Sequence, residues 1–189
     1  LRAASKAHSD LVVVHIDAHT DTYRGDGNQD YMRFNVATTF TRAAEEALID
    51  VESSIHVGAR GPTNDSGVFN HTRDVGYGLI DSTELFNAGL RNTAKNIVDS
   101  LNGRSVYLCF DMDFFDPSCA PGVCTPTWGG ATSREGLDFL QNLTGLNLVG
   151  ADINTVSPPH DISGMTAFLA ATVGLEILSV ICHSKGLVE

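Results

Sequence analysis

LVVVHIDAHTD, residues 11–21, is the stretch that decides the fold. Its first six residues form a short, mostly apolar and β-branched run, which is typical of a strand buried on both faces of a parallel sheet. Three further apolar runs of strand length follow at residues 54–57, 105–110 and 147–153. Each run leads into polar or glycine-rich sequence, so the pattern predicts at least four strands of a mostly parallel sheet.

Segments of helical composition lie between these runs, at residues 37–48, 82–101 and 133–143. Ser82 and Ser133 stand where an N-cap is expected. A weakly signalled extra strand is expected near residues 77–80. Alternating strands and helices imply right-handed crossovers, which place helices on both faces of the sheet. Residues 163–184 are apolar almost all round, so we expect a last helix packed deep against the sheet.

The composition excludes several classes of protein. The 189 residues are 42% hydrophobic and 19% charged, and no repeat or proline-rich linker divides them, which predicts one globular domain over residues 1–189. A net charge of −11 disfavours a nucleic-acid surface. Apolar runs such as Leu11–Val14 fall short of the roughly 20 residues of a membrane span, and the four cysteines lack paired spacing. We therefore expect a cytoplasmic protein that contacts neither nucleic acid nor membrane.

Acidic side chains follow two of the predicted strands. Asp17, His19 and Asp21 occupy alternate positions after the first strand, and Asp111 and Asp113 do the same after the run at 105–110. Alternate residues of an extended chain share a face, and ligands gather at the carboxyl ends of parallel strands. No lysine or arginine adjoins either cluster in the sequence, so we expect a divalent metal, Mn²⁺ first and Ni²⁺ or Zn²⁺ next. The alternative is that these residues are strand-end caps and turn acids.

Five segments resemble motifs of the ureohydrolase family, which includes arginase, agmatinase and guanidinobutyrase. They are DAHTD (17–21), IHVGARG (55–61), FDMDFFDPSCAPGVCTP (110–126), GGATSRE (129–135) and GADINTVSPPHD (150–161). The resemblance implies a three-layer α/β/α sandwich with two Mn²⁺ ions, or Ni²⁺ in some members. It also implies hydrolysis of C–N bonds in linear guanidines or amidines by a water activated between the two ions, and an assembly of three or six subunits.

Carried over position by position, the resemblance makes Asp17 and Asp111 the carboxylates that bridge the ions. Asp21 would complete one ion, and His19 and Asp113 the other. Asp113 would also act as the general acid and base for the leaving nitrogen. The family takes one more histidine from a Gly-Gly-Asp-His segment before the first strand, which is not present here. We therefore expect the sequence to be the C-terminal two-thirds of a longer chain.

The sequence departs from the family pattern on the substrate side. Asn35 precedes Val36, which stands where the family has a histidine, and Thr155 stands where it has a glutamate that grips the guanidinium. His160 is a candidate to take over proton transfer, and Trp128 is a candidate wall of the substrate pocket. The loss of polar groups indicates a substituted guanidine, or a biguanide such as metformin.

Two alternatives remain at this stage. The first is a metal-binding but catalytically silent subunit of a hetero-oligomer, since it would keep every ligand and lose the substrate contacts. The second is a zinc deacetylase of similar fold, which the paired aspartates of FDMDFFDP disfavour because they suit two ions rather than one. Asp26 and Asp30 are loop acids that could face a cationic substrate, although a solvated position is expected.

Overall fold

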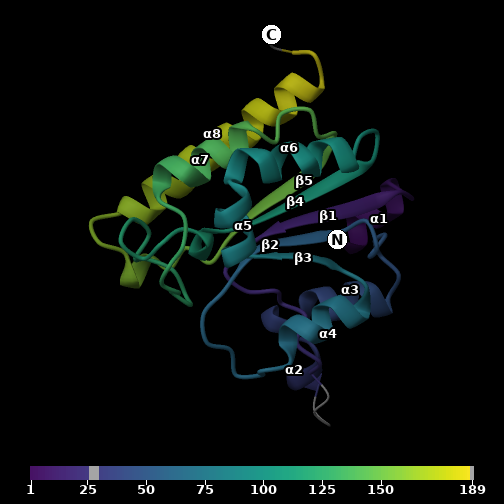
Figure 1. The fold of residues 1–189 in the computed structure, drawn as a ribbon, viewed down its shortest axis with the longest axis horizontal. Coiled ribbons are helices and arrows are strands. Elements are labelled where there is room, and N and C mark those ends of the chain that lie inside the picture. Colours follow the sequence, from purple (N-terminus) through teal and green to yellow (C-terminus); the bar gives the residue numbers. More distant parts are fainter. Residues whose placement is uncertain (26–29, 188–189) are drawn as a thin grey trace.

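A computed structural model, which describes residues 1–25 and 30–187, has three layers with a parallel sheet in the middle (Figure 1). The sheet has five strands in the order β3-β2-β1-β4-β5. They are β1 (Leu11–Ile16), β2 (Ile55–Ala59), β3 (Gly78–Asp81), β4 (Ser105–Asp111) and β5 (Leu148–Asn154). The predicted fold class is confirmed, and the weakly signalled strand near residues 77–80 is present as β3.

β1 lies at the centre of the sheet, and all six of its residues are buried. It pairs in parallel with β2 on one side and with β4 on the other. Val12, Val14 and Ile16 belong to one hydrophobic core and Leu11 and Val13 to another, because alternate side chains of a strand point to opposite faces. A strand buried in this way needs an unbroken apolar run, which is the pattern the sequence has.

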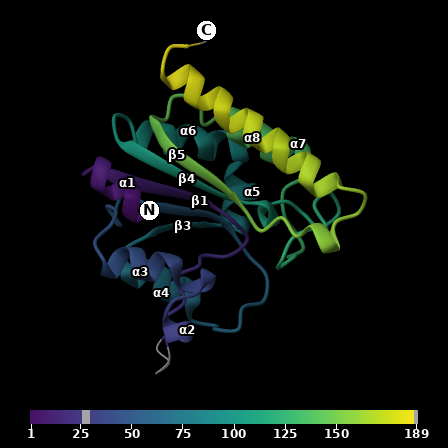
Figure 2. The same ribbon diagram turned by 180° about the vertical axis from the view of Figure 1, so that it is seen from behind.

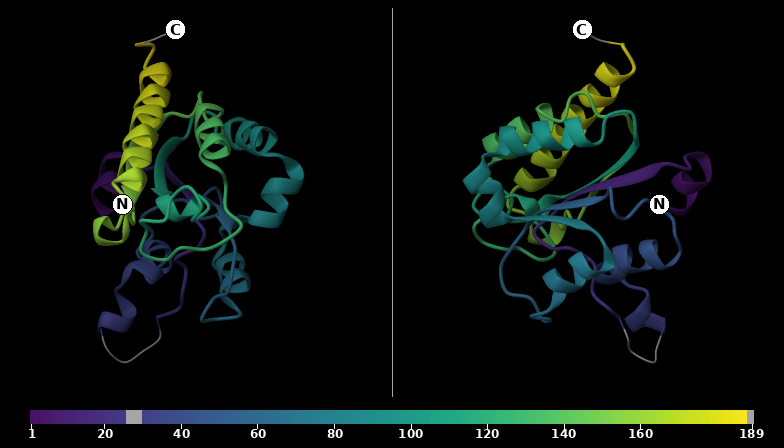
Figure 3. Two further views of the ribbon diagram at one scale, coloured as in Figure 1. Left: turned by 90° about the vertical axis from the view of Figure 1, so that its left-hand side faces the viewer. Right: turned by 45° about the vertical axis from the view of Figure 1, so that its right-hand side comes forward.

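Helices cover both faces of the sheet (Figures 1 and 2). One layer holds α5 (Ser82–Ala88), α6 (Leu90–Ser100), α7 (Ser133–Gln141) and α8 (Met165–Ser184). The other side holds α1 (Arg2–Ala7), α2 (Asp30–Arg33), α3 (Thr39–Glu45) and α4 (Val68–Val75). Short 3-10 turns complete the chain at Val36–Thr38, Met112–Phe114 and Pro158–His160. Figure 3 shows the same arrangement from two further directions, with α8 (yellow) above the sheet and the blue helices below it.

The predicted helix boundaries need correction. The helix expected over residues 82–101 is two helices, because Gly89 adopts a φ of 83° between α5 and α6. The N-caps are not Ser82 and Ser133 but the residues before them: Asp81 accepts a hydrogen bond from the backbone N–H of Glu84, and Thr132 caps α7 in the same way. Both caps are capping boxes, each closed by a glutamate three residues after the cap. Counting three residues from Ser82 or Ser133 does not reach a glutamate, so the boxes were not predicted.

α8 is not packed deep against the sheet as expected. One face, including Val173, Ile177 and Val180, is buried on α7 and β5, whereas Phe168 and Leu175 on the opposite face are 74% and 67% exposed. Among the described residues, Met165–Ser184 is long and apolar enough to cross a membrane by length and composition alone. The expectation that the apolar runs fall short of a membrane span is therefore wrong for this segment.

Candidate metal centre

The carboxylates that follow β1 and β4 meet at one end of the sheet. Ile16 and Phe110 are partners in the β1–β4 ladder, so Asp17, directly after β1, lies beside Asp111, the last residue of β4. Asp113 stands in the 3-10 turn that follows β4. Asp17, Asp111 and Asp113 are all buried, at 3%, 5% and 1% exposure, so their charges are almost wholly withdrawn from water.

His19 connects two of these carboxylates. Its Nδ1 lies 3.2 Å from Oδ1 of Asp17 and 3.1 Å from Oδ2 of Asp113. The backbone N–H of His19 also donates to Oδ1 of Asp17 at 2.6 Å, and that of Ala18 donates to Oδ1 of Asp113 at 3.1 Å. The hydroxyl of Thr125 donates to Oδ2 of Asp113 at 2.8 Å. The turn after β1 is therefore fixed to the turn after β4.

Thr155 is also committed to a carboxylate. Its hydroxyl donates to Oδ1 of Asp111, which accepts a second hydrogen bond from the backbone N–H of Asp113 at 2.8 Å. Thr155 adopts a φ of 63°, a conformation unusual for a branched residue, immediately after β5. The side chain at the position of the family's glutamate thus points to the acidic cluster and supports Asp111.

The acidic cluster is difficult to ionise without a cation. Burial, with the charge of Asp17, raises the pKa of Asp21 to about 7. Burial, with the charges of Asp17 and Asp113, raises the pKa of Asp111 to about 9. Burial opposes protonation of His19, but hydrogen bonds to Asp113 and Asp17 outweigh it and raise the pKa of this imidazole to about 10. A bound divalent ion would stabilise the forms of these groups that bind metal, namely the ionised carboxylates and the neutral imidazole.

The donor set fits two neighbouring metal ions. Ligand atoms of His15, Asp17 and Asp21 lie within 4.8 Å of one another, and so do those of Asp17, His19 and Asp113. Asp17 is common to both groups, which is the arrangement that a bridging carboxylate requires. Asp111 belongs to neither group, although its Oδ1 accepts a hydrogen bond from the backbone N–H of Asp113, a member of the second group. Oxygen ligands with an imidazole suit Mn²⁺ and other divalent ions of the first transition row.

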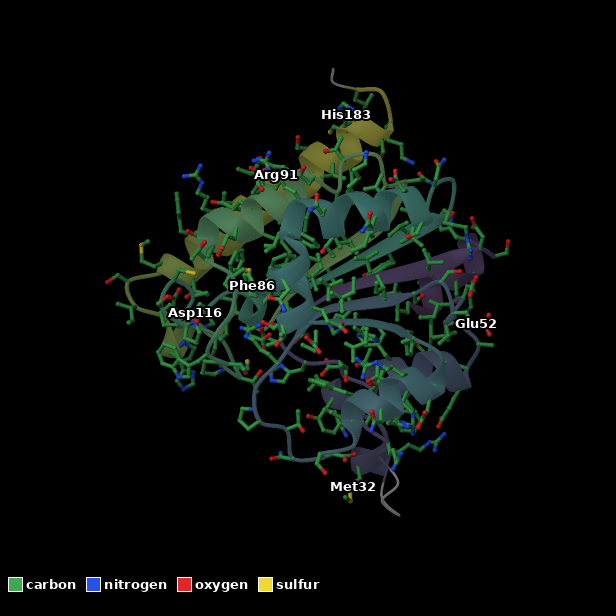
Figure 4. The ribbon with its side chains drawn as sticks, viewed as in Figure 1. Met32, Glu52, Phe86, Arg91, Asp116 and His183 are labelled. Carbon is green, nitrogen blue, oxygen red and sulfur yellow. The ribbon has the colours of Figure 1, made fainter. Side chains whose placement is uncertain are left out.

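A cavity of about 810 Å³ opens over the cluster. The five predicted metal ligands line it, together with Asn35, Val36, Trp128 and Thr155, which were predicted to contact substrate. Met32 of α2 also lines the cavity and is labelled in Figure 4. His160 is not among the described residues that line the cavity: it is exposed, and its Nδ1 lies 2.8 Å from the hydroxyl of Ser157.

Arg60 is a site residue that the sequence interpretation missed. Its buried guanidinium donates to the backbone carbonyls of Asp113 at 2.7 Å and of Thr127 at 2.8 Å. Arg60 thus supports the loop of Asp113 from the end of β2, although it forms no ion pair with the carboxylates of the described residues. The signal was its place directly after a strand, in IHVGARG. Asp26 and the side chain of Asp30 lie outside the described residues.

His15, a buried residue of β1, also contacts the cluster. Its Nε2 lies 2.9 Å from Oδ2 of Asp17. Burial acts against the charged forms of both groups, but their mutual attraction raises the pKa of His15 and holds the pKa of Asp17 below its usual range. Asp17 therefore differs from Asp21 and Asp111, because it alone of the three has an imidazole on each oxygen.

Comparison with known proteins agrees with this geometry. A model of the Arginase family matches residues 1–179. The chain belongs to the arginase family. The resemblance inferred from the five sequence motifs is thereby confirmed, and so is the arginase-like fold.

Individual members of the arginase family show the extent of the likeness. The guanidinobutyrase of Pseudomonas aeruginosa is 35% identical over 96% of this chain and 56% of its own length. An agmatinase of Escherichia coli is 35% identical over 98% of the chain and 56% of its own length. The solved proclavaminate amidino hydrolase of Streptomyces clavuligerus is 36% identical, with a TM-score of 0.88 over 97% of the chain and 60% of its own. The chain thus spans little more than half the length of these relatives.

Proposed function

We propose that the protein uses two divalent metal ions to hydrolyse a C–N bond in a linear guanidine or amidine. Mn²⁺ is the preferred metal, and Ni²⁺ is the alternative. Asp17, His19, Asp21, Asp111 and Asp113 would hold the ions. The observation that carries this proposal is that ligand atoms of Asp17 lie within 4.8 Å of Asp21 on one side and of His19 and Asp113 on the other, and that all four side chains line one cavity. The names of the relatives, guanidinobutyrase and agmatinase, support the same reaction class.

The chemistry divides between the ions and the chain. Bound divalent ions lower the pKa of water and so supply a nucleophile at neutral pH. Asp113 is placed to accept a proton through Oδ2 and to return it to the leaving nitrogen, because this oxygen faces the cavity side chains His19 and Thr125. The hydroxyl of Thr125, 2.8 Å away, orients this carboxylate. Arg60 fixes the backbone of Asp113 from behind.

The cavity wall favours a substrate with alkyl groups on its guanidine. Val36 is 82% exposed and Trp128 74% exposed, and both line the cavity. The hydroxyl of Thr155 is bonded to Asp111 and carries no charge to pair with guanidinium N–H groups. A site without such acceptors discriminates weakly in favour of an unsubstituted guanidine. We therefore propose a substituted guanidine or a biguanide such as metformin, and the negative cluster suits its positive charge.

The test is metal analysis together with measurement of the released urea, amine and ammonia, on full-length protein loaded with Mn²⁺ or Ni²⁺. Agmatine, 4-guanidinobutyrate and an N,N-dimethylbiguanide are compared by kcat/KM. We expect two equivalents of metal and a preference of about tenfold or more for the alkylated substrate. Thr155→Glu should shift the preference toward agmatine, and Thr155→Ser, which keeps the hydroxyl on Asp111, should not.

The outcomes separate the candidates. A wild-type preference for agmatine would contradict the substrate assignment while leaving the reaction class in place. Two bound ions with no turnover of any guanidine would instead support the catalytically silent subunit, whose basis is the absence of the family's histidine at Val36 and of its glutamate at Thr155.

We further propose that residues 1–189 are one domain from a longer chain that works as a cytoplasmic oligomer. β5 is an edge strand whose residues after Leu148 are only partly buried or exposed, and the outward face of α8 is apolar. Both surfaces suit coverage by further chain or by another subunit. The acidic balance of −11 supports a soluble location. Light scattering of the full-length protein would give the size of the assembly.

A further inference from the structure

Two histidines lie beneath the acidic cluster on neighbouring strands. His15 of β1 and His56 of β2 are partners in the parallel ladder, and both are 1% exposed. Nδ1 of His15 lies 2.8 Å from Nδ1 of His56, while Nε2 of His15 lies 2.9 Å from Oδ2 of Asp17. The three side chains form a chain of hydrogen bonds that ends on the carboxylate shared by the two ligand groups.

Hydrogen-bond chemistry fixes the direction of one of these contacts. An ionised carboxylate only accepts, so the hydrogen between His15 and Asp17 must lie on Nε2 of His15. Two ring nitrogens 2.8 Å apart also need one hydrogen between them, so one histidine donates to the other. Whichever ring donates, His56 holds the plane of His15, and His15 holds one oxygen of Asp17.

Aromatic packing prevents the two rings from turning. The ring centroids of His15 and Phe40 are 4.4 Å apart, and those of His56 and Tyr77 are 4.7 Å apart. The hydroxyl of Tyr77 donates to the backbone carbonyl of Phe40 at 2.9 Å, a bond that involves neither histidine. The direction in which Nε2 of His15 points is therefore set by tightly packed neighbours.

Stability alone does not account for this pair. Within the described part of the chain, Nε2 of His56 is buried and has no hydrogen-bond partner. A buried polar atom without a partner costs about 1–3 kcal/mol, and an apolar pair of similar size would avoid that cost. The contribution of the pair must therefore be sought at Asp17.

We propose that His15 is a positioning residue for Asp17 and that His56 is the residue that orients His15. This inference rests on the proposed function, because Asp17 matters as the carboxylate common to both metal ions. Oδ1 of Asp17 is held by His19 and Oδ2 by His15, so the carboxylate presents a fixed plane to the cavity floor. Partners of this kind typically change metal affinity by about 10–100-fold when they are removed.

The experiment is a titration of full-length protein with Mn²⁺ in the absence of substrate, by calorimetry, with folding followed by circular dichroism. His15→Leu should weaken Mn²⁺ binding by about 10–100-fold. His15→Gln, whose amide nitrogen can replace Nε2 as the donor, should recover most of the loss. His56→Leu should give a smaller loss. Tyr77→Phe is the control from the same cage: it should lower the melting temperature and leave Mn²⁺ affinity unchanged.

Three results would overturn the positioning role. The first is wild-type Mn²⁺ affinity in folded His15→Leu, and the second is an equal loss in Tyr77→Phe. The third is the disappearance of one equivalent of Mn²⁺ in both His15→Leu and His15→Gln, which would make His15 a ligand. If His15→Leu does not fold, an unchanged affinity in both His15→Gln and Tyr77→Phe together with a loss in His56→Leu would still support the role. Because no substrate is used, failure of guanidine turnover leaves this measurement intact.

Discussion

At the scale of single residues, the acids of the cavity floor differ because their partners differ. Asp17 has an imidazole on each oxygen, which holds its pKa below the usual range against the effect of burial. Asp21 is partly buried and Asp111 is buried, both face other carboxylates, and their pKa values rise to about 7 and about 9. A divalent ion entering the site must therefore displace protons, so its affinity is linked to pH.

The sign of this pH dependence follows from the shifts. The raised pKa values of Asp21 and Asp111 mean that each costs stability as the pH rises from about 4 to its folded-state pKa. His19 acts in the same direction: the stability that its protonated ring gives to the fold is complete below pH 6.5 and is lost as the pH approaches about 10. The metal-free protein should therefore melt at a lower temperature at pH 8.5 than at pH 6. The rise in melting temperature on adding Mn²⁺ should be greater at pH 8.5.

Asp111→Asn is the control for that prediction. The amide keeps an acceptor for Thr155 and Asp113 and removes the charge, so the metal-free variant should be more stable than wild type at pH 8.5 by about 1–2 kcal/mol. It should also lose most of the stabilisation by Mn²⁺. An Mn²⁺-induced shift that is the same at both pH values in the wild-type protein would contradict the linkage.

At the scale of elements, two helices on one face of the sheet begin with reciprocal caps. Asp81 and Glu84 close the start of α5, and Thr132 and Glu135 close the start of α7. Oε2 of Glu135 accepts from the backbone N–H of Thr132 at 2.9 Å. α7 follows the loop that carries Thr125 and Trp128, so this cap also fixes where the cavity wall ends.

Thr132→Ala should lower the free energy of unfolding by about 1 kcal/mol, because the N-terminal N–H groups of α7 lose their side-chain acceptor. Ser133→Ala is the matched control one residue later. It should change the free energy of unfolding by less than about 0.5 kcal/mol, since the cap remains and alanine favours the helix. Urea unfolding of both variants is the measurement, and a larger loss in Ser133→Ala would place the cap at the serine.

At the scale of the whole molecule, the side of the sheet formed by β5 has an uncovered strand edge and an uncovered helix face. β5 forms one edge of the sheet, and α8 packs on it with its buried side only (Figure 2). Phe168, Leu175 and Leu178 lie on the opposite side of α8, seven and three residues apart, and are all more than half exposed. An apolar stripe of this kind is unusual on the surface of a monomeric soluble protein.

Leu175→Glu tests whether the full-length protein covers this stripe. In the 189-residue chain it should change the free energy of unfolding by less than about 0.5 kcal/mol, because Leu175 is 67% exposed. In the full-length protein it should cost about 2 kcal/mol or more, since a charge would be buried. Ile177→Ala, on the covered side of α8, should cost about 2–5 kcal/mol in both. Equal, small effects of Leu175→Glu in both proteins would show that the stripe stays exposed.

The sequence by itself determined the sheet and the place of the acidic cluster. An unbroken apolar run reports burial on both faces, and the carboxyl ends of parallel strands meet, so Asp17 and Asp111 could be placed together although they are far apart in the chain. The packing side of α8 was not determined, because a helix that is apolar all round carries no amphipathic signal for which side is buried.

Only the tertiary structure decided the contacts that support the cluster. The bond of Arg60 to the loop of Asp113, the bond of Thr155 to Asp111 and the contact of His15 with His56 join residues 53, 44 and 41 positions apart. The exclusion of His160 from the cavity was decided in the same way. Periodicity and spacing describe neighbours along one strand or helix, whereas these contacts depend on strand register and on loop paths across the sheet.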